Sequence, residues 1–226
     1  MTIKKQVQTP LYYFSRMDKE DKLNKFADAT HIDPVLMEEA RKAFKNRQHE
    51  RNVVFIALAV TSWEWYGMND NGDSFYEENI SNIVENIDTL PVAFKTFEGK
   101  PLNRYHQQKG ENSGIGKIHY AYYNQDQHRV ELVCEAFWDK APAECIKIKR
   151  GVPLKVSMSC ATPFDYCPVC GNAAATLDDH CDHIKYELMS IIDGVPVEMI
   201  NRPTYSELSL VVIPGDQNCN VMYSLK

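Results

Sequence analysis

The stretch VVFIALAVTSWEWY, residues 53–66, is dense in β-branched and aromatic residues and is followed by MNDNGD, residues 68–73. Residues of the first kind favour strands, and an Asn-Gly pair favours a tight turn. We therefore expect the β-rich part of the chain to begin at Val53. The longest apolar run, residues 53–60, is far shorter than the roughly 20 residues that cross a bilayer, so we expect no membrane partner.

Strand-like segments recur along the rest of the chain, separated by turn residues and by few helical stretches. We expect short helices over 76–88 and 141–150, the second one stopped by Gly151. The pattern predicts an α+β fold, a mostly antiparallel β-barrel with peripheral helices. Its expected strands are a hairpin over 116–123 and 129–137, a strand over 154–161, two strands around the Asp193-Gly194 turn and a last strand over 205–213.

Residues 1–50 are polar and favour helix, and Asp33 followed by Pro34 is typical of a helix start. This segment is either a regulatory arm or a helix packed on the main domain. We divide the chain into an N-terminal helical arm, residues 1–50, and a main domain, residues 51–226. Within the main domain, residues 162–184 form a Cys/His insertion.

The charge and cysteine content narrow the classes of partner and compartment. The 226 residues include 25 Lys and Arg against 31 Asp and Glu, a formal net charge of −6. Without a basic surface we expect no nucleic-acid partner. The seven cysteines are an odd number, which together with their crowding fits a metal site in a reducing compartment better than disulfides.

Three of the cysteines lie in one short segment beside two histidines. The sequence CPVCGN, residues 167–172, and the sequence HCDH, residues 180–183, supply tight pairs of ligands. Four such ligands suit tetrahedral zinc, and a site closed by four protein ligands has a structural role. Cys167, Cys170 and Cys181 are the expected thiolate ligands, and the fourth position is open between His180 and His183.

The segment GVPLKVSMSC, residues 151–160, carries Ser157 and Ser159 on one face of its strand. A serine nucleophile needs a base, and a carboxylate commonly orients that base. His106 lies in NRYHQQK, before a glycine-rich bend, from which a loop could reach the strand of Ser157. Glu207 opens the last apolar strand, in YSELSLVVIPG, residues 205–215.

These segments together resemble the serine proteases that mature the proheads of tailed bacteriophages, distant relatives of the herpesvirus assemblin proteases. The resemblance rests on an ordered set of motifs covering about two-thirds of the chain: NDNGDSF (69–75), KTFEGKPLNRYH (95–106), SGIGKI (113–118), the strand of Ser157 and the strand of Glu207. It implies an assemblin-like barrel with Ser157 as nucleophile, His106 as base and Glu207 as the third member. It also favours His183 as the fourth zinc ligand.

The resemblance further implies an endopeptidase that cleaves scaffold or core proteins, the major capsid protein and itself inside the assembling prohead, in the host cytoplasm. A homo-oligomer is compatible with this role. Two departures from the family pattern stand out. Ser159 replaces the glycine expected two residues after the nucleophile and is the alternative nucleophile, and Pro214, Gly215 and Asp216 follow the last strand where the herpesvirus enzymes have arginines. The alternative function is a non-enzymatic virion or scaffold-associated protein with a zinc knuckle.

Overall fold

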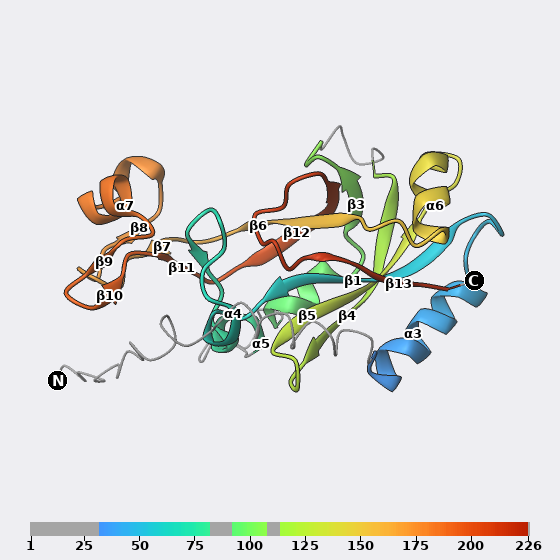
Figure 1. The fold of residues 1–226 in the computed structure, drawn as a ribbon, viewed down its shortest axis with the longest axis horizontal. Helices are drawn as coiled ribbons and strands as arrows, with labels where there is room; N and C mark the ends of the chain where they lie inside the picture. The colour runs from blue at the N-terminus through green and yellow to red at the C-terminus, as the bar shows by residue number, and fades with distance from the viewer. Residues whose placement is uncertain (1–31, 82–91, 108–113, 226) are drawn as a thin grey trace.

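The computed structural model describes residues 32–81, 92–107 and 114–225. Its centre is a closed barrel of seven strands in the order β1-β13-β6-β12-β3-β4-β5 (Figure 1). The barrel is mixed, because β3 runs parallel to β12 while the other neighbours are antiparallel. The predicted α+β class, with a barrel and peripheral helices, is confirmed at this level. The barrel strands are β1 (Val53–Thr61), β3 (Pro101–Arg104), β4 (Gly116–Asn124), β5 (Arg129–Ala136), β6 (Lys155–Ala161), β12 (Thr204–Val211) and β13 (Asn220–Ser224).

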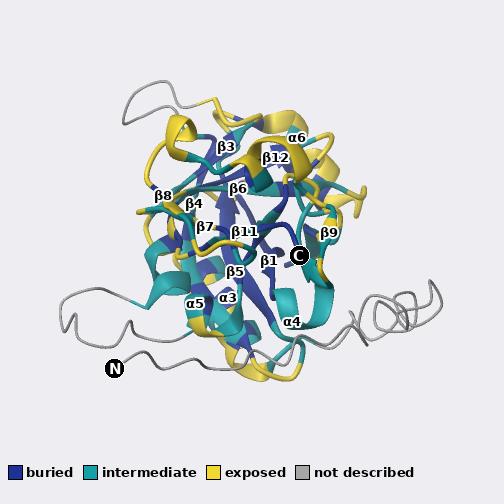
Figure 2. Cartoon of the chain, turned by 90° about the vertical axis from the view of Figure 1, so that its left-hand side faces the viewer, coloured by how far each residue is buried: buried dark blue, intermediate teal, exposed yellow. Residues whose placement is uncertain are grey.

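Strand β1 is buried along its whole length, which explains its continuous apolar sequence. Phe55 and alternate residues face the barrel interior, whereas Val54 and Ile56 face helix α3 (Pro34–Lys45) on the outside. Figure 2 shows β1 and β5 within the buried centre of the molecule. A strand covered on both faces needs no polar alternation. The β-rich part of the chain therefore begins at Val53, as expected.

The peripheral helices agree in part with the sequence. Helix α3 begins as predicted, with the Asp33 side chain accepting a hydrogen bond from the Val35 amide, and it packs on the barrel. Residues 1–31 of the expected arm lie outside the described residues. Helix α6 (Pro142–Lys149) is confirmed, and Gly151 follows it at φ 70°. No helix among the described residues is long and apolar enough to cross a membrane.

Two of the expected elements differ from the structure. The strand does not continue through WEWY, because Trp63–Tyr66 form the short helix α4, which ends at Gly67 in a left-handed conformation. Of the expected helix over 76–88, the structure has α5 (Glu77–Ser81), while 82–91 lie outside the described residues.

A Cys/His module, residues 165–201, projects from one end of the barrel, at the left of Figure 1. It has its own small core, formed by Cys167, Ile184 and Val197. The turn at Asp193 and Gly194 joins the two short strands as predicted, but these strands pair with each other rather than with the barrel. The module contains β7 (Asp165–Tyr166), β8 (Ala173–Ala174), the 3₁₀ helix η3 (Leu177–Asp179), α7 (Asp182–Glu187), β9 (Ile191–Ile192), β10 (Val195–Pro196) and β11 (Met199–Asn201), and β11 also pairs with β2 (Asp73–Ser74).

Strands β3 and β13 were not predicted. Strand β13 closes the barrel between β1 and β6, and β3 leads the chain to the turn that carries His106. Before β3, the 3₁₀ helix η2 (Ala93–Phe97) stacks its Phe97 ring on Tyr205 with ring centres 4.0 Å apart. Such pairs stabilise a core beyond the area that they bury, and this one fixes η2 against β12.

Candidate active site

Five polar side chains meet on the outer face of three adjacent barrel strands. Strand pairing places Ser209 of β12 opposite Asn103 of β3 on one side and Ser157 of β6 on the other, and it places Glu207 opposite Ser159. The alternate residues of the same strands fill the barrel interior. Because side chains alternate between the two faces of a strand, these polar groups share one face over the nucleophile strand that the sequence predicted.

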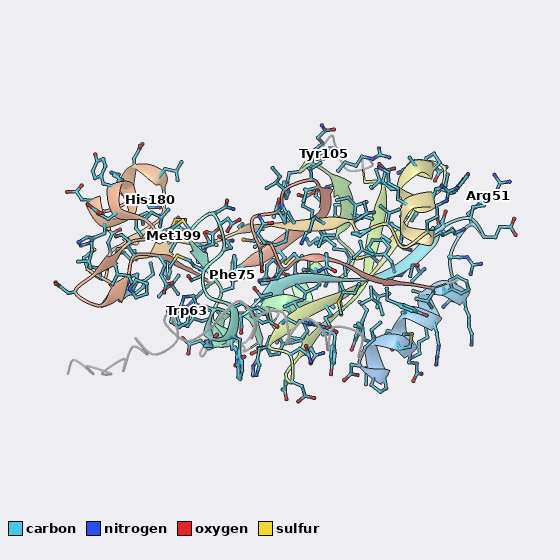
Figure 3. All side chains as sticks on the ribbon, viewed as in Figure 1. Arg51, Trp63, Phe75, Tyr105, His180 and Met199 are labelled. Atoms are coloured by element: carbon cyan, nitrogen blue, oxygen red, sulfur yellow. The ribbon has the colours of Figure 1, made fainter. Side chains whose placement is uncertain are left out.

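His106 is placed on this face by a strained turn at the end of β3. Figure 3 labels Tyr105, the residue before it. Tyr105 and His106 both have left-handed backbone conformations, with φ of 48° and 56°. Such conformations cost about 1–3 kcal/mol each in non-glycine residues and concentrate at functional sites. Two hydrogen bonds to β12 hold the turn: the Tyr105 amide donates to the Leu210 carbonyl and the His106 amide to Ser209 Oγ, each over 3.1 Å.

The carboxylate of Glu207 is fully buried and lies directly against the His106 ring. Glu207 Oε1 is 2.6 Å from His106 Nδ1, while Oε2 accepts hydrogen bonds from Asn103 Nδ2 and Ser209 Oγ. Burial alone would raise the pKa of Glu207, but the hydrogen bonds from Asn103, His106 and Ser159 outweigh it and leave the pKa below its ordinary value. Glu207 therefore stays ionised and holds the imidazole by Nδ1.

Ser159, rather than Ser157, is the serine that contacts this pair. Ser159 Oγ lies 3.0 Å from His106 Nδ1 and donates to Glu207 Oε1 over 2.7 Å. Ser157 makes no side-chain hydrogen bond to any described residue, and it lies opposite Ser209, whose hydroxyl accepts the His106 amide. The structure thus brings His106 and Glu207 together as predicted, with Ser159 beside them and Ser157 one position further along the same face.

A cavity of about 110 Å³ adjoins Ser157. Its walls are β1, the turn that begins at Asn69, strand β6 and the loop from Asp216 to Cys219. Val156, Met158 and other apolar side chains line it together with Asp73 and Asp216. Because Val156, Met158 and Cys160 alternate with the two serines along β6, the cavity lies mainly on the interior side of that strand.

Sequence reasoning missed Asn103 and Ser209, the groups that bind the far oxygen of Glu207. Asn103 is 2% exposed, and its short segment PLNR, residues 101–104, has no pattern that marks it as part of a site. Two other histidines, on or beside the barrel strands, are bound elsewhere. His119 pairs with Glu135, and His128 pairs with Glu77.

The predicted metal ligands come together in the Cys/His module. One ligand atom each from Cys167, Cys170, Cys181 and His183 lie within 4.8 Å of one another. His183 Nδ1 is 3.9 Å from the sulfurs of Cys167 and Cys181, close to the roughly 3.5–3.8 Å that separate two ligands of tetrahedral zinc with Zn–S of about 2.3 Å. The donor set and its spacing fit a metal ion with a closed coordination shell.

His180 does not belong to this cluster. Its Nε2 lies 2.9 Å from Asp165 Oδ2, so the ring is held against β7. Of the two histidines that the spacing left open, His183 is the one that joins the cysteines.

The module is bonded to the turn that walls the cavity. Strand β2 pairs with β11, Asn201 Nδ2 donates to Asp73 Oδ1 over 2.8 Å, and buried Glu198 accepts from Ser74 Oγ over 2.7 Å. On the other side of the turn, the Asp70 amide donates to the Gly215 carbonyl. Figure 3 shows Met199 of the module and Phe75 of the turn in this region. Residues 70–74, which wall the cavity beside Ser157, are therefore hydrogen-bonded to the module that carries the metal ligands.

Comparisons with protein-family models, with curated proteins and with solved structures find no match for this chain.

Proposed function

We propose that the chain is a serine endopeptidase in which Ser157 is the nucleophile, His106 the general base and Glu207 the group that orients the base. The observation that carries this proposal is the buried carboxylate of Glu207, 2.6 Å from His106 Nδ1 on a strained turn above the serine-bearing strand. An ionised carboxylate in this position holds the imidazole in one tautomer and stabilises the imidazolium that forms during catalysis.

The choice of Ser157 follows from the two nitrogens of the ring. Glu207 binds Nδ1, so Nε2 is the nitrogen left to accept a proton. Ser159 contacts Nδ1, the carboxylate side of the ring, whereas Ser157 lies one position further along the same face and is the serine that the resemblance implies as nucleophile. In the proposed reaction Nε2 takes the Ser157 proton, Ser157 attacks the peptide carbonyl, the protonated ring gives that proton to the leaving amine, and water hydrolyses the acyl-enzyme.

The resemblance of the ordered motifs to the prohead proteases supports a role in bacteriophage capsid maturation. The proposed substrates are scaffold or core proteins, the major capsid protein and the chain itself, cleaved within the assembling prohead in the host cytoplasm. We further propose an assemblin-like fold for the barrel. High local concentration inside a prohead compensates for weak affinity between enzyme and substrate.

The metal that the module would hold is zinc in this proposal. Cys167, Cys170, Cys181 and His183 would bind it, and it would supply structural stability rather than a reactive water, because four protein ligands fill the tetrahedral shell. The chemistry at Ser157 requires no metal.

Labelling with a fluorophosphonate, followed by peptide mapping, tests the proposed function. We expect one adduct, on Ser157, that is absent from Ser157→Ala and persists in Ser159→Ala. An adduct on Ser159 would keep the reaction class and change the nucleophile. A folded protein that forms no adduct on either serine would refute the proposed enzymatic activity. It would favour the alternative function, a non-enzymatic virion or scaffold-associated protein.

A further inference from the structure

We propose that Ser159 is a positioning residue that fixes the tautomer and the orientation of His106 through Glu207. This proposal rests on the proposed function and assigns a role to the residue at which this chain departs from the Ser-x-Gly pattern. The role is distinct from that of a nucleophile, because Ser159 would not bond to substrate.

Both contacts of the Ser159 hydroxyl lie on the carboxylate side of the ring. Its single proton is donated to Glu207 Oε1 over 2.7 Å, which leaves the oxygen lone pairs to face His106 Nδ1 at 3.0 Å. Nδ1 also lies 2.6 Å from Oε1, so the three atoms form a closed triangle. In the proposed tautomer, Oε1 and Oγ share the Nδ1 proton and Nε2 carries none.

To act as a general base, His106 needs an unprotonated Nε2. A neutral imidazole has one donor and one acceptor nitrogen, and its hydrogen-bond partners decide which is which. Glu207 alone presents one oxygen to Nδ1, whereas Glu207 and Ser159 together present two acceptors from two strands. The second acceptor restricts rotation of a ring whose side chain is 40% exposed.

The position of Ser159 in the sheet explains why a serine can do this. Ser159 lies directly opposite Glu207, where the register of β12 shifts between Tyr205 and Glu207. Opposed side chains on neighbouring strands start only about 5 Å apart, so a short hydroxyl reaches the carboxylate. Glycine at 159 would provide neither the donor to Oε1 nor the acceptor for Nδ1.

The experiment measures the His106 tautomer directly. Ring ¹⁵N chemical shifts of His106 are recorded above the pH of its titration in the wild type and in Ser159→Ala, Ser159→Gly and Ser159→Thr. Ser206→Ala is the matched control, because Ser206 is a neighbouring serine whose hydroxyl donates only to the Ser159 carbonyl. The rate of fluorophosphonate labelling is measured on the same proteins.

We expect the Nδ1–H tautomer in the wild type, in Ser206→Ala and in Ser159→Thr, which keeps the hydroxyl. Ser159→Ala and Ser159→Gly should show a mixture with the Nε2–H tautomer. Their labelling of Ser157 should slow by about 10- to 100-fold, as expected for loss of a hydrogen bond to a charged group. Both Ser159→Ala and Ser159→Gly are included, so that if one of them fails to fold, the other still tests the role of the hydroxyl.

Two results would overturn the proposal: an adduct on Ser159 itself, or an unchanged tautomer and labelling rate in the variants without the hydroxyl. A wild type that forms no adduct on any serine would reject the proposed function instead. In that case the ¹⁵N shifts still decide whether Ser159 fixes the ring, since they need no reaction.

Discussion

Replacement of Glu207 should separate its structural contribution from its chemical one. In the folded protein the carboxylate accepts hydrogen bonds from Asn103, Ser159, Ser209 and His106. Glu207→Ala removes all four acceptor contacts. The Ser159 hydroxyl and the 40% exposed His106 ring can reach water, and the buried Ser209 hydroxyl can rotate, but the Asn103 amide is 2% exposed and is left without an acceptor.

An unsatisfied buried donor costs about 1–3 kcal/mol, and the space left by the deleted side chain adds about 1 kcal/mol. Glu207→Ala should thus lower the free energy of unfolding by about 2–4 kcal/mol, which for a domain of this size is a drop of about 4–16 °C in Tm. Glu207→Gln keeps the volume. With its carbonyl oxygen at the position of Oε2, the glutamine still accepts the hydrogen bonds from Asn103 Nδ2 and Ser209 Oγ. We expect a loss of only about 1 kcal/mol.

Both variants should nevertheless lose about 10³- to 10⁴-fold in reactivity, because neither provides a charge against the imidazolium. The assay combines thermal unfolding with the rate of fluorophosphonate labelling at Ser157. A Glu207→Gln protein that labels at the wild-type rate would refute the reasoning, since the carboxylate would then have no role beyond filling its site.

Three further predictions concern pH, the metal site and the barrel. Hydrogen bonds outweigh burial and lower the pKa of Glu207 in the folded protein below its ordinary value of 4.5. The ionised carboxylate therefore stabilises the fold at pH values above the pKa of the unfolded chain, and this stabilisation is lost as the pH falls through the pKa of the folded protein. The Tm of the wild type should fall more steeply below about pH 4.5 than that of Glu207→Gln. At the proposed zinc site, His183→Gln should abolish zinc binding, measured by elemental analysis, and lower the Tm, whereas His180→Gln should leave the zinc content equal to that of the wild type. Gly116→Ala would place a Cβ 2.0 Å from the Glu135 carbonyl oxygen and should cost about 3 kcal/mol or more in chemical unfolding. Gly99→Ala meets no atom within 4 Å and should cost about 1–2 kcal/mol, from its left-handed backbone; equal losses in the two variants would contradict the packing argument.

Secondary structure was predicted correctly from the sequence where neighbouring residues in the chain determine it. The hairpin of β4 and β5, the Asp33 cap and the helix before Gly151 each follow from residues close in sequence. Strand β3 has only four residues, and β13 follows a polar loop. Both strands form because the barrel offers them partners, and that is information the segments themselves do not contain.

The sequence by itself determined the residue types of this protein's site: a Cys/His quartet, two serines on one strand face, and a histidine and a glutamate on distant segments. Ligand spacing and strand alternation are local, so they can be read from the chain. Only the tertiary structure decided that His183 rather than His180 joins the cysteines, that Asn103 and Ser209 hold Glu207, and that Ser159 shares Nδ1 of His106. These contacts depend on the register of β12 against β3 and β6, which is set by closure of the whole barrel rather than by any one segment.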